Sequence, residues 1–243
     1  MPDDVESEYA RQGRERLLPT KHSKTEVWDQ KRRLASALRI VIERVVPSDA
    51  PAEELSRAAD ALERYAEQLE QHPRLQRRMG YPEASNSGDV LAFFDQSPLI
   101  GLANPLAPPI SISVTGNETA LGEVTFASAY EGPPGHVHGG FIAAAFDEVL
   151  GFVQSLSGTP GMTGTLGVRY RKPTPLHTPL RFEARYLRTE GRKVYAEAQL
   201  FAEGVLLAEA DGLFISMREG GMLELDEQRE AWEAQRASKK EQA

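Results

Sequence analysis

The chain has 243 residues, no cysteine and a formal net charge of −8 at pH 7. Without cysteine it has no disulfide, thiolate metal site or cysteine nucleophile, and its acidic balance gives no overall reason to expect nucleic-acid binding. No uninterrupted apolar run approaches the roughly 18 residues of a membrane span, and the acidic start is unlike a secretory signal. We therefore expect a cytoplasmic protein with no membrane span.

The N-terminal part predicts a polar tail followed by two helices. Residues 1–24 are charged and polar, which is typical of a solvated tail; an arm that docks on a partner subunit is the alternative. Apolar residues recur at spacings of three and four from Thr25 to Val46, and again from Leu55 to Leu69. Two such helices joined by a short turn form a hairpin, and we expect their apolar stripes to be buried against each other and against another domain or subunit.

The connection to the main domain is irregular. Residues 73–109 are rich in proline, glycine and serine, and residues 90–94 predict a short helix within them. We place the start of the main domain near residue 97. The predicted organisation is a polar tail (1–24), a helical extension (25–96), a main domain (97–218) and a polar C-terminal tail or short helix (219–243).

Hydrophobic periodicity in the main domain predicts two strands, one long helix and four further strands. The first two strands are expected at residues 110–114 and 121–128, on either side of a Gly-Asn turn. The last four strands are expected at 163–171, 180–186, 194–201 and 205–217. In the strand at 163–171, the alternation places Thr163 and Tyr170 on opposite faces of the sheet. This pattern is α+β, with an antiparallel sheet of about six strands that meander after one central helix.

The central helix is the alanine-rich, apolar run from Phe141 to Leu156. Gly139 and Gly140 fall in its first turn, where backbone amides lack intrahelical partners and can donate to an oxygen that develops negative charge. Asp147 lies near the middle of the run, where an unpaired charge is costly. An interface ion pair or helix cap is the alternative role for Asp147, and a helix entry without a ligand is the alternative for the glycines.

Gly139 and Asp147 cannot serve one substrate from a single straight helix. The eight residues between them correspond to about 12 Å of helix. Two such helices packed antiparallel about a twofold axis bring the amide end of one beside the carboxylate of the other. We therefore expect a homo-oligomer, a dimer or a dimer of dimers, with the site shared across the interface.

The motif His138-Gly139-Gly140, with Asp147 nine positions after the histidine, resembles the hot-dog-fold acyl-coenzyme A thioesterases of the phenylacetate-pathway (PaaI) type. The chain is also similar to the mammalian two-part members of the thioesterase superfamily. The resemblance covers residues 97–218 and continues at Gly161 to Pro175, Gly191 to Tyr195 and Ala208 to Ser216. It implies a hot-dog fold, in which the sheet wraps the central helix, and hydrolysis of acyl-coenzyme A to a free acid and coenzyme A.

The resemblance also implies roles for the site residues. Asp147 acts as general base or nucleophile, and the amides of Gly139 and Gly140 donate to the thioester oxygen. His138 orients the loop before the helix. Thr163 occupies the position of a hydroxyl residue that holds the water beside the aspartate, although by type it is an ordinary strand former.

Other residues are predicted to bind the substrate. Three apolar residues of the helix are expected to line a pocket: Phe141, Ile142 and Phe146. Three cations are candidates for the phosphates of coenzyme A, with a solvated strand face as the alternative: Arg169, Arg171 and Lys172. Adjacent helix positions point about 100° apart, so only one of Asp147 and Glu148 faces the site, and we choose Asp147.

Several chemistries are disfavoured. His136 and His138 could bind a metal only with a third ligand, and the next histidine, His177, is about 40 residues away in the sequence. No metal site is therefore predicted. No cofactor is expected, because coenzyme A enters as part of the substrate, and no serine-hydrolase elbow or nucleotide-binding glycine loop is present. Enoyl hydration in hot-dog proteins is associated with a histidine where this chain has Phe152. The alternative to an enzyme is a hot-dog module that binds an acyl ligand without turnover and whose helical extension mediates protein partnering.

Overall fold

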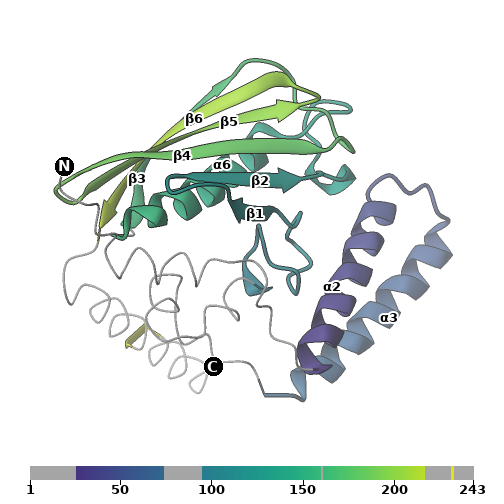
Figure 1. The fold of residues 1–243 in the computed structure, drawn as a ribbon. Helices are drawn as coiled ribbons and strands as arrows, with labels where there is room; N and C mark the ends of the chain where they lie inside the picture. The colour runs from purple at the N-terminus through teal and green to yellow at the C-terminus, as the bar shows by residue number, and fades with distance from the viewer. Residues whose placement is uncertain (1–25, 74–94, 160, 217–230, 233–243) are drawn as a thin grey trace.

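The computed structural model describes residues 26–73, 95–159, 161–216 and 231–232. The predicted tail at 1–24 and the predicted helix at 90–94 lie outside this part of the chain, as does the C-terminal segment 219–243 except for two residues. The described part has two N-terminal helices, one sheet and one long helix against the sheet (Figure 1).

Six strands form one antiparallel sheet in the order β1-β2-β4-β5-β6-β3. The strands are β1 (Ser111–Val114), β2 (Thr119–Val124), β3 (Gly161–Tyr170), β4 (Leu180–Glu190), β5 (Lys193–Ala202) and β6 (Val205–Ser216). The central helix α6 spans Gly139–Gln154 and lies along one face of the sheet (Figure 1). An antiparallel sheet wrapped around one long helix is the hot-dog fold, so the predicted fold class is confirmed.

The core lies between α6 and the sheet. In β4 the residues Leu180, Phe182 and Ala184 are buried and the charged residues between them are exposed, as the alternation predicted. The ring of Phe182 meets the ring of Phe146 edge to face, with centroids 5.1 Å apart. The stretch Gly139–Ser157 is long and apolar enough to cross a membrane by composition alone, and its position against the sheet accounts for that apolar character.

The second strand ends earlier than predicted. β2 follows β4 in register as far as the pair Val124 and Leu180. The chain then leaves the ladder and forms a 3₁₀ turn at Ser128–Tyr130. Phe126 is nevertheless fully buried, so the apolar residues that suggested a longer strand reach the core from a loop.

The prediction that the last four strands meander in order is also wrong. β3 pairs with β6 and forms an edge of the sheet, so it is not a neighbour of β4. The segment between β3 and β4 does not close a hairpin, because its backbone is bonded to the loop before α6. Val137 N–H donates to the carbonyl of Thr174, and Leu176 N–H donates to the carbonyl of Gly135.

A β-bulge reverses the predicted facing of Thr163. Thr163 lies opposite Phe214 and Thr165 lies opposite Leu213, so Gly164 is an extra residue in β3. One extra residue shifts the alternation by one position. Thr163 therefore lies on the same face of β3 as Tyr170, the face that contacts α6.

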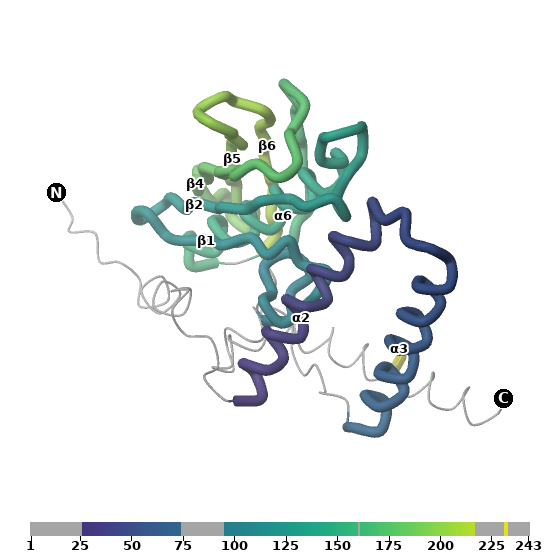
Figure 2. The backbone as a smooth tube through the Cα atoms, turned by 90° about the vertical axis from the view of Figure 1, so that its right-hand side faces the viewer, coloured from purple at the N-terminus to yellow at the C-terminus, as the bar shows by residue number. Residues whose placement is uncertain are grey.

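The N-terminal helices are α2 (Glu26–Val45) and α3 (Ala52–Glu70), close to the predicted ranges. α2 lies between α3 and the sheet domain, which comprises residues 95–159 and 161–216 (Figures 1 and 2). The expectation that their apolar stripes bury each other is wrong. Only Ala35 is buried in α2 and no residue is buried in α3. Four apolar side chains of α3 are exposed: Leu55, Leu62, Tyr65 and Leu69.

Polar side chains instead attach α2 to the sheet domain. Arg32 bonds both carboxylate oxygens of the fully buried Asp95, at 3.1 and 2.6 Å. Arg39 donates to two backbone carbonyls of the segment before β1. Glu43 accepts hydrogen bonds from the backbone N–H and the hydroxyl of Ser128, at 2.7 and 2.9 Å. Charge-assisted bonds at three positions along α2 set its orientation. They explain why α2 is held against the sheet domain rather than against α3.

Candidate active site

The start of α6 offers one free backbone amide. His138 is the N-cap residue, and its Nδ1 accepts a hydrogen bond from the N–H of Gly140 at 3.0 Å. The N–H of Phe141 donates to the carbonyl of His138. Among the described residues, no acceptor is bonded to the N–H of Gly139. The two glycines therefore differ: Gly140 is used in the cap, and Gly139 presents a donor at the positive end of the helix.

Tyr170 lies beside this first turn, and sequence reasoning missed it. Its hydroxyl donates to the carbonyl of Gly139 at 2.7 Å, and its side chain is about half exposed. A Cβ added at Gly139 would lie 3.5 Å from the tyrosine ring, an ordinary van der Waals distance. An aromatic residue in a strand carries no local signal for such a contact, because the contact depends on how β3 packs along α6.

Asp147 is held by Thr163. The hydroxyl of Thr163 donates to Oδ1 of Asp147 at 2.8 Å, and Asp147 is half-buried. Within the described ranges, the second carboxylate oxygen, Oδ2, has no hydrogen-bond partner. A carboxylate that is oriented through one oxygen and open at the other is suited to accept a proton from water.

The neighbouring acid, Glu148, has a different environment. Its carboxylate is hydrogen-bonded to Ser97, in the segment before β1. Burial raises the pKa of Glu148 from 4.5 to about 7; the charge of Asp147 adds to this rise and the bond to Ser97 opposes it. Asp147 and Glu148 thus contact different elements, as their separation of about 100° around the helix predicts.

We expect Glu148→Gln to stabilise the protein at pH 8 but not at pH 5. The pKa of Glu148 is higher in the folded chain than in the unfolded chain, so its contribution to stability is present below pH 4.5 and is lost as the pH rises through about 7. The contribution of Glu148 to the free energy of unfolding therefore falls by at most roughly 3 kcal/mol between low pH and pH 8. Urea unfolding of both proteins at the two pH values, at one protein concentration, measures it.

The control is Glu183→Gln, which changes an exposed glutamate of β4 that is paired with Arg181. We expect this variant to show the same difference from the wild type at both pH values. A Glu148→Gln variant whose stability follows that of the wild type from pH 5 to pH 8 would contradict the assignment.

Of the three apolar residues predicted to line a pocket, Phe141 lines a cavity formed by residues that the structure describes. Ile142 is 3% exposed and Phe146 is fully buried, so both belong to the core between α6 and the sheet. Their helical positions face the sheet, and a part of these two residues in substrate binding stays a prediction. Phe141 is half-buried and lines a cavity of about 110 Å³ between α2 and the sheet domain.

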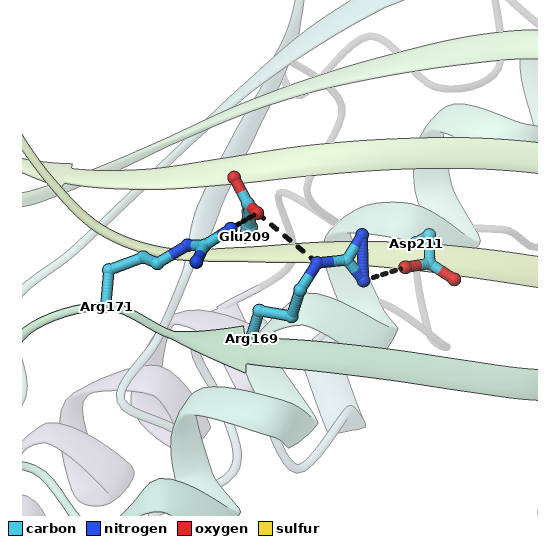
Figure 3. A network of polar contacts seen from close by, with 4 residues as sticks. All are labelled: Arg169, Arg171, Glu209 and Asp211. Atoms are coloured by element: carbon cyan, nitrogen blue, oxygen red, sulfur yellow. Dashed lines mark hydrogen bonds and ion pairs between the residues drawn. The ribbon is translucent and has the colours of Figure 1, made fainter.

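The predicted phosphate-binding arginines lie on the face of β3 that points away from α6. Figure 3 shows both guanidinium groups directed at acids of β6. Arg169 bonds Glu209 at 3.3 Å and Asp211 at 2.7 Å, and Arg171 also bonds Glu209, which lowers the pKa of that acid. Exposed ion pairs of this kind match the alternative interpretation, a solvated strand face. Lys172 is exposed as well, and binding of coenzyme A phosphates by these three cations stays a prediction.

The histidines have separate partners. Nδ1 of His136 lies 2.8 Å from the carbonyl oxygen of Pro134, and Nε2 of His177 lies 3.2 Å from the hydroxyl of Ser128. In the part of the chain that the structure describes, no three histidine or acidic side chains gather into a group that could hold a metal ion.

Known proteins share this architecture. The family model of the thioesterase superfamily matches residues 134–209, which include α6, β3, β4 and β5. The crystal structure of protein RHA08564, a thioesterase superfamily protein, is 31% identical, has a TM-score of 0.68, and the match covers 76% of this chain and 94% of that chain.

Two curated relatives are acyl-coenzyme A thioesterase THEM4 of Xenopus laevis and of Mus musculus. Each is 36% identical over 89 residues, which is 36% of this chain. The matched segment spans 40% of the length of the Xenopus laevis protein and 38% of the Mus musculus protein.

Proposed function

This chain belongs to the thioesterase superfamily, and from that premise we propose that it hydrolyses acyl-coenzyme A to a free acid and coenzyme A. The observation that carries the proposal is the pair of groups on α6, the free amide of Gly139 and the carboxylate of Asp147 held by Thr163. Hydrolysis of a thioester needs a donor for the oxygen that becomes negative and a base for the attacking water. These two groups supply both.

In the proposed reaction Asp147 accepts a proton from water as the water oxygen attacks the thioester carbonyl carbon. The carbonyl π electrons move to the oxygen, which accepts a hydrogen bond from the N–H of Gly139. The tetrahedral intermediate collapses, its carbon–sulfur bond breaks, and the leaving thiolate takes the proton from Asp147. Water is the only co-reactant, and direct attack by the carboxylate is the alternative first step.

We propose that two subunits share this site. Gly139 and Asp147 of one chain are about 12 Å apart along α6. β3 is an edge strand that carries Tyr170 against Gly139 near one end and Thr163 against Asp147 near the other. If two β3 strands pair antiparallel about a twofold axis at the middle of the strand, Thr163 of one subunit lies opposite Tyr170 of the other. Asp147 of one subunit then lies beside the free amide of the other.

The edge itself supports such pairing. β3 is ten residues long and mostly exposed, whereas the opposite edge strand, β1, has four residues. A long unpaired edge is a template for another strand.

The first test of the proposed function is an assay of the purified full chain against a panel of acyl-coenzyme A thioesters that measures released thiol. Calorimetric binding of a thioester without thiol release would identify the alternative, a binding module without turnover.

We expect Gly139→Pro to lower kcat by about 100- to 1,000-fold without loss of helix α6, because it removes the proposed oxyanion donor. Gly139 is the first helical residue, a position that proline favours. His138 has φ −61° and ψ 132°, the conformation preferred before proline. Thiol-release kinetics and circular dichroism measure the two effects.

The matched variant is Gly139→Ala, which adds a Cβ but keeps the N–H. We expect it to retain much more activity than Gly139→Pro. Equal losses in the two variants would show that bulk at this position, rather than the lost amide, is responsible.

A further inference from the structure

A cavity of about 110 Å³ lies where α2 meets the sheet domain. Ile42 and neighbouring residues of α2 form one side of it. The opposite side is formed by the loop around Ala127 and Ala129, by Tyr130 and by Phe141 of α6, and Leu106 closes part of the rim. The cavity therefore exists only because α2 is attached at this place.

Three of the four polar side chains that line this cavity, all except Thr125, are bonded to the protein. Arg39 donates to two backbone carbonyls, and Glu43 accepts from Ser128. The hydroxyl of Tyr130 donates to the carbonyl of Leu106 at 2.6 Å. With these groups engaged, the surface that remains is mainly aliphatic and aromatic, which suits an apolar guest.

The cavity lies at the same end of α6 as the free amide of the candidate active site. Phe141, which forms part of the wall, is two residues after Gly139 in the first turn of α6. Tyr130 accepts a hydrogen bond at its carbonyl from the N–H of His138 at 2.9 Å, and its ring meets the ring of Phe141 edge to face at 5.0 Å. An acyl chain that extended from a thioester bound at the amide of Gly139 past Phe141 would reach this space.

We propose that the cavity receives the acyl group of the substrate and that α2 is its outer wall. The inference rests on the proposed thioesterase function and assigns its substrate class. An engineered apolar cavity of about 150 Å³ holds benzene, so one of 110 Å³ holds about four or five carbon atoms. The substrates are therefore short aliphatic acyl thioesters. Longer chains exceed this space, and the bonds of α2 to Asp95, to Ser128 and to the backbone before β1 oppose any widening of it.

The test compares kcat/KM for acetyl-, butyryl-, hexanoyl-, decanoyl- and palmitoyl-coenzyme A in the full chain. In the wild type we expect a maximum at butyryl or hexanoyl. Ile42→Ala removes three carbons from the wall, and we expect it to raise the ratio of decanoyl to butyryl activity about tenfold. Ala129→Leu adds three carbons to the opposite wall, and we expect it to lower the ratio of hexanoyl to acetyl activity about tenfold.

The matched control is Ile40→Ala, the same substitution two residues earlier in α2 at a side chain that is 58% exposed. We expect its chain-length profile to equal that of the wild type. Unchanged profiles in both wall variants, with circular dichroism showing that each is folded, would overturn the acyl-pocket inference while the proposed function stands. A wild type that releases no thiol from any of the five substrates would overturn the proposed function itself.

Discussion

Asp147→Asn is expected to lower kcat for acyl-coenzyme A hydrolysis by about a thousandfold, the effect of removing a general base. Asparagine has nearly the same shape as aspartate, and its amide oxygen can accept the bond from the hydroxyl of Thr163. The half-buried position then keeps its contacts, so we expect unfolding free energy and oligomeric state to change little. Only the capacity to take a proton from water, or to attack the carbonyl, is lost.

The measurement is thiol release under saturating substrate, with circular dichroism and analytical ultracentrifugation on the same samples. Asp211→Asn is the control, because Asp211 is exposed on the face of the sheet away from α6 and bonds only Arg169 among the described residues. We expect this control to keep wild-type kcat. If Asp147→Asn kept it too, the proton acceptor would be another group, and Glu148 would be the first to examine.

Mixing two inactive variants is expected to restore about a quarter of wild-type activity. Asp147→Asn lacks the base and Gly139→Pro lacks the amide donor. If each site takes its base from one subunit and its amide from the other, a mixed dimer has one intact site and one site that lacks both groups. Random association of equal amounts makes half of the dimers mixed, and half of the sites in those dimers are intact.

The experiment requires subunit exchange, by co-expression with two different tags or by joint refolding. Activity of each variant alone gives the baseline, and a mixture of Asp147→Asn with wild type controls for loss during refolding. If both groups acted within one chain, each subunit would keep one of the two defects and the mixture would stay inactive. Absence of activity in isolated mixed dimers would therefore contradict a shared site.

The parts of the fold that depend on local sequence were predicted closely. The alanine-rich run after the two glycines forms α6, and the alternating residues of β4 are buried and exposed as expected. Helix and strand periods are properties of neighbouring residues, so a single sequence is enough to find them. The central position of Asp147 and the place of Gly139 at the helix start follow from the same local pattern.

The features that the sequence did not predict concern contacts between distant segments. Phe146 has the same apolar character as Phe141, yet it packs against Phe182 in the core while Phe141 lines the cavity. The apolar stripes of α2 and α3 gave no indication that α2 would be held on the sheet domain by polar side chains. Where an apolar side chain or a helix packs depends on which surfaces meet in the folded chain, and periodicity along the sequence does not contain that information.

The amino-acid sequence by itself determined the order of the elements, the fold class and the positions of a helix-start glycine pair and a mid-helix aspartate, because each rests on residues close together in the chain. The tertiary structure alone decided three features of the site. The bulge at Gly164 places the hydroxyl of Thr163 beside Asp147. Nδ1 of His138 accepts the hydrogen bond of the Gly140 N–H, which leaves the N–H of Gly139 without an acceptor among the described residues. Helix α2 forms one wall of a cavity beside Phe141. Each of these depends on hydrogen bonding or packing in three dimensions, where a shift of one residue or one partner changes which groups meet.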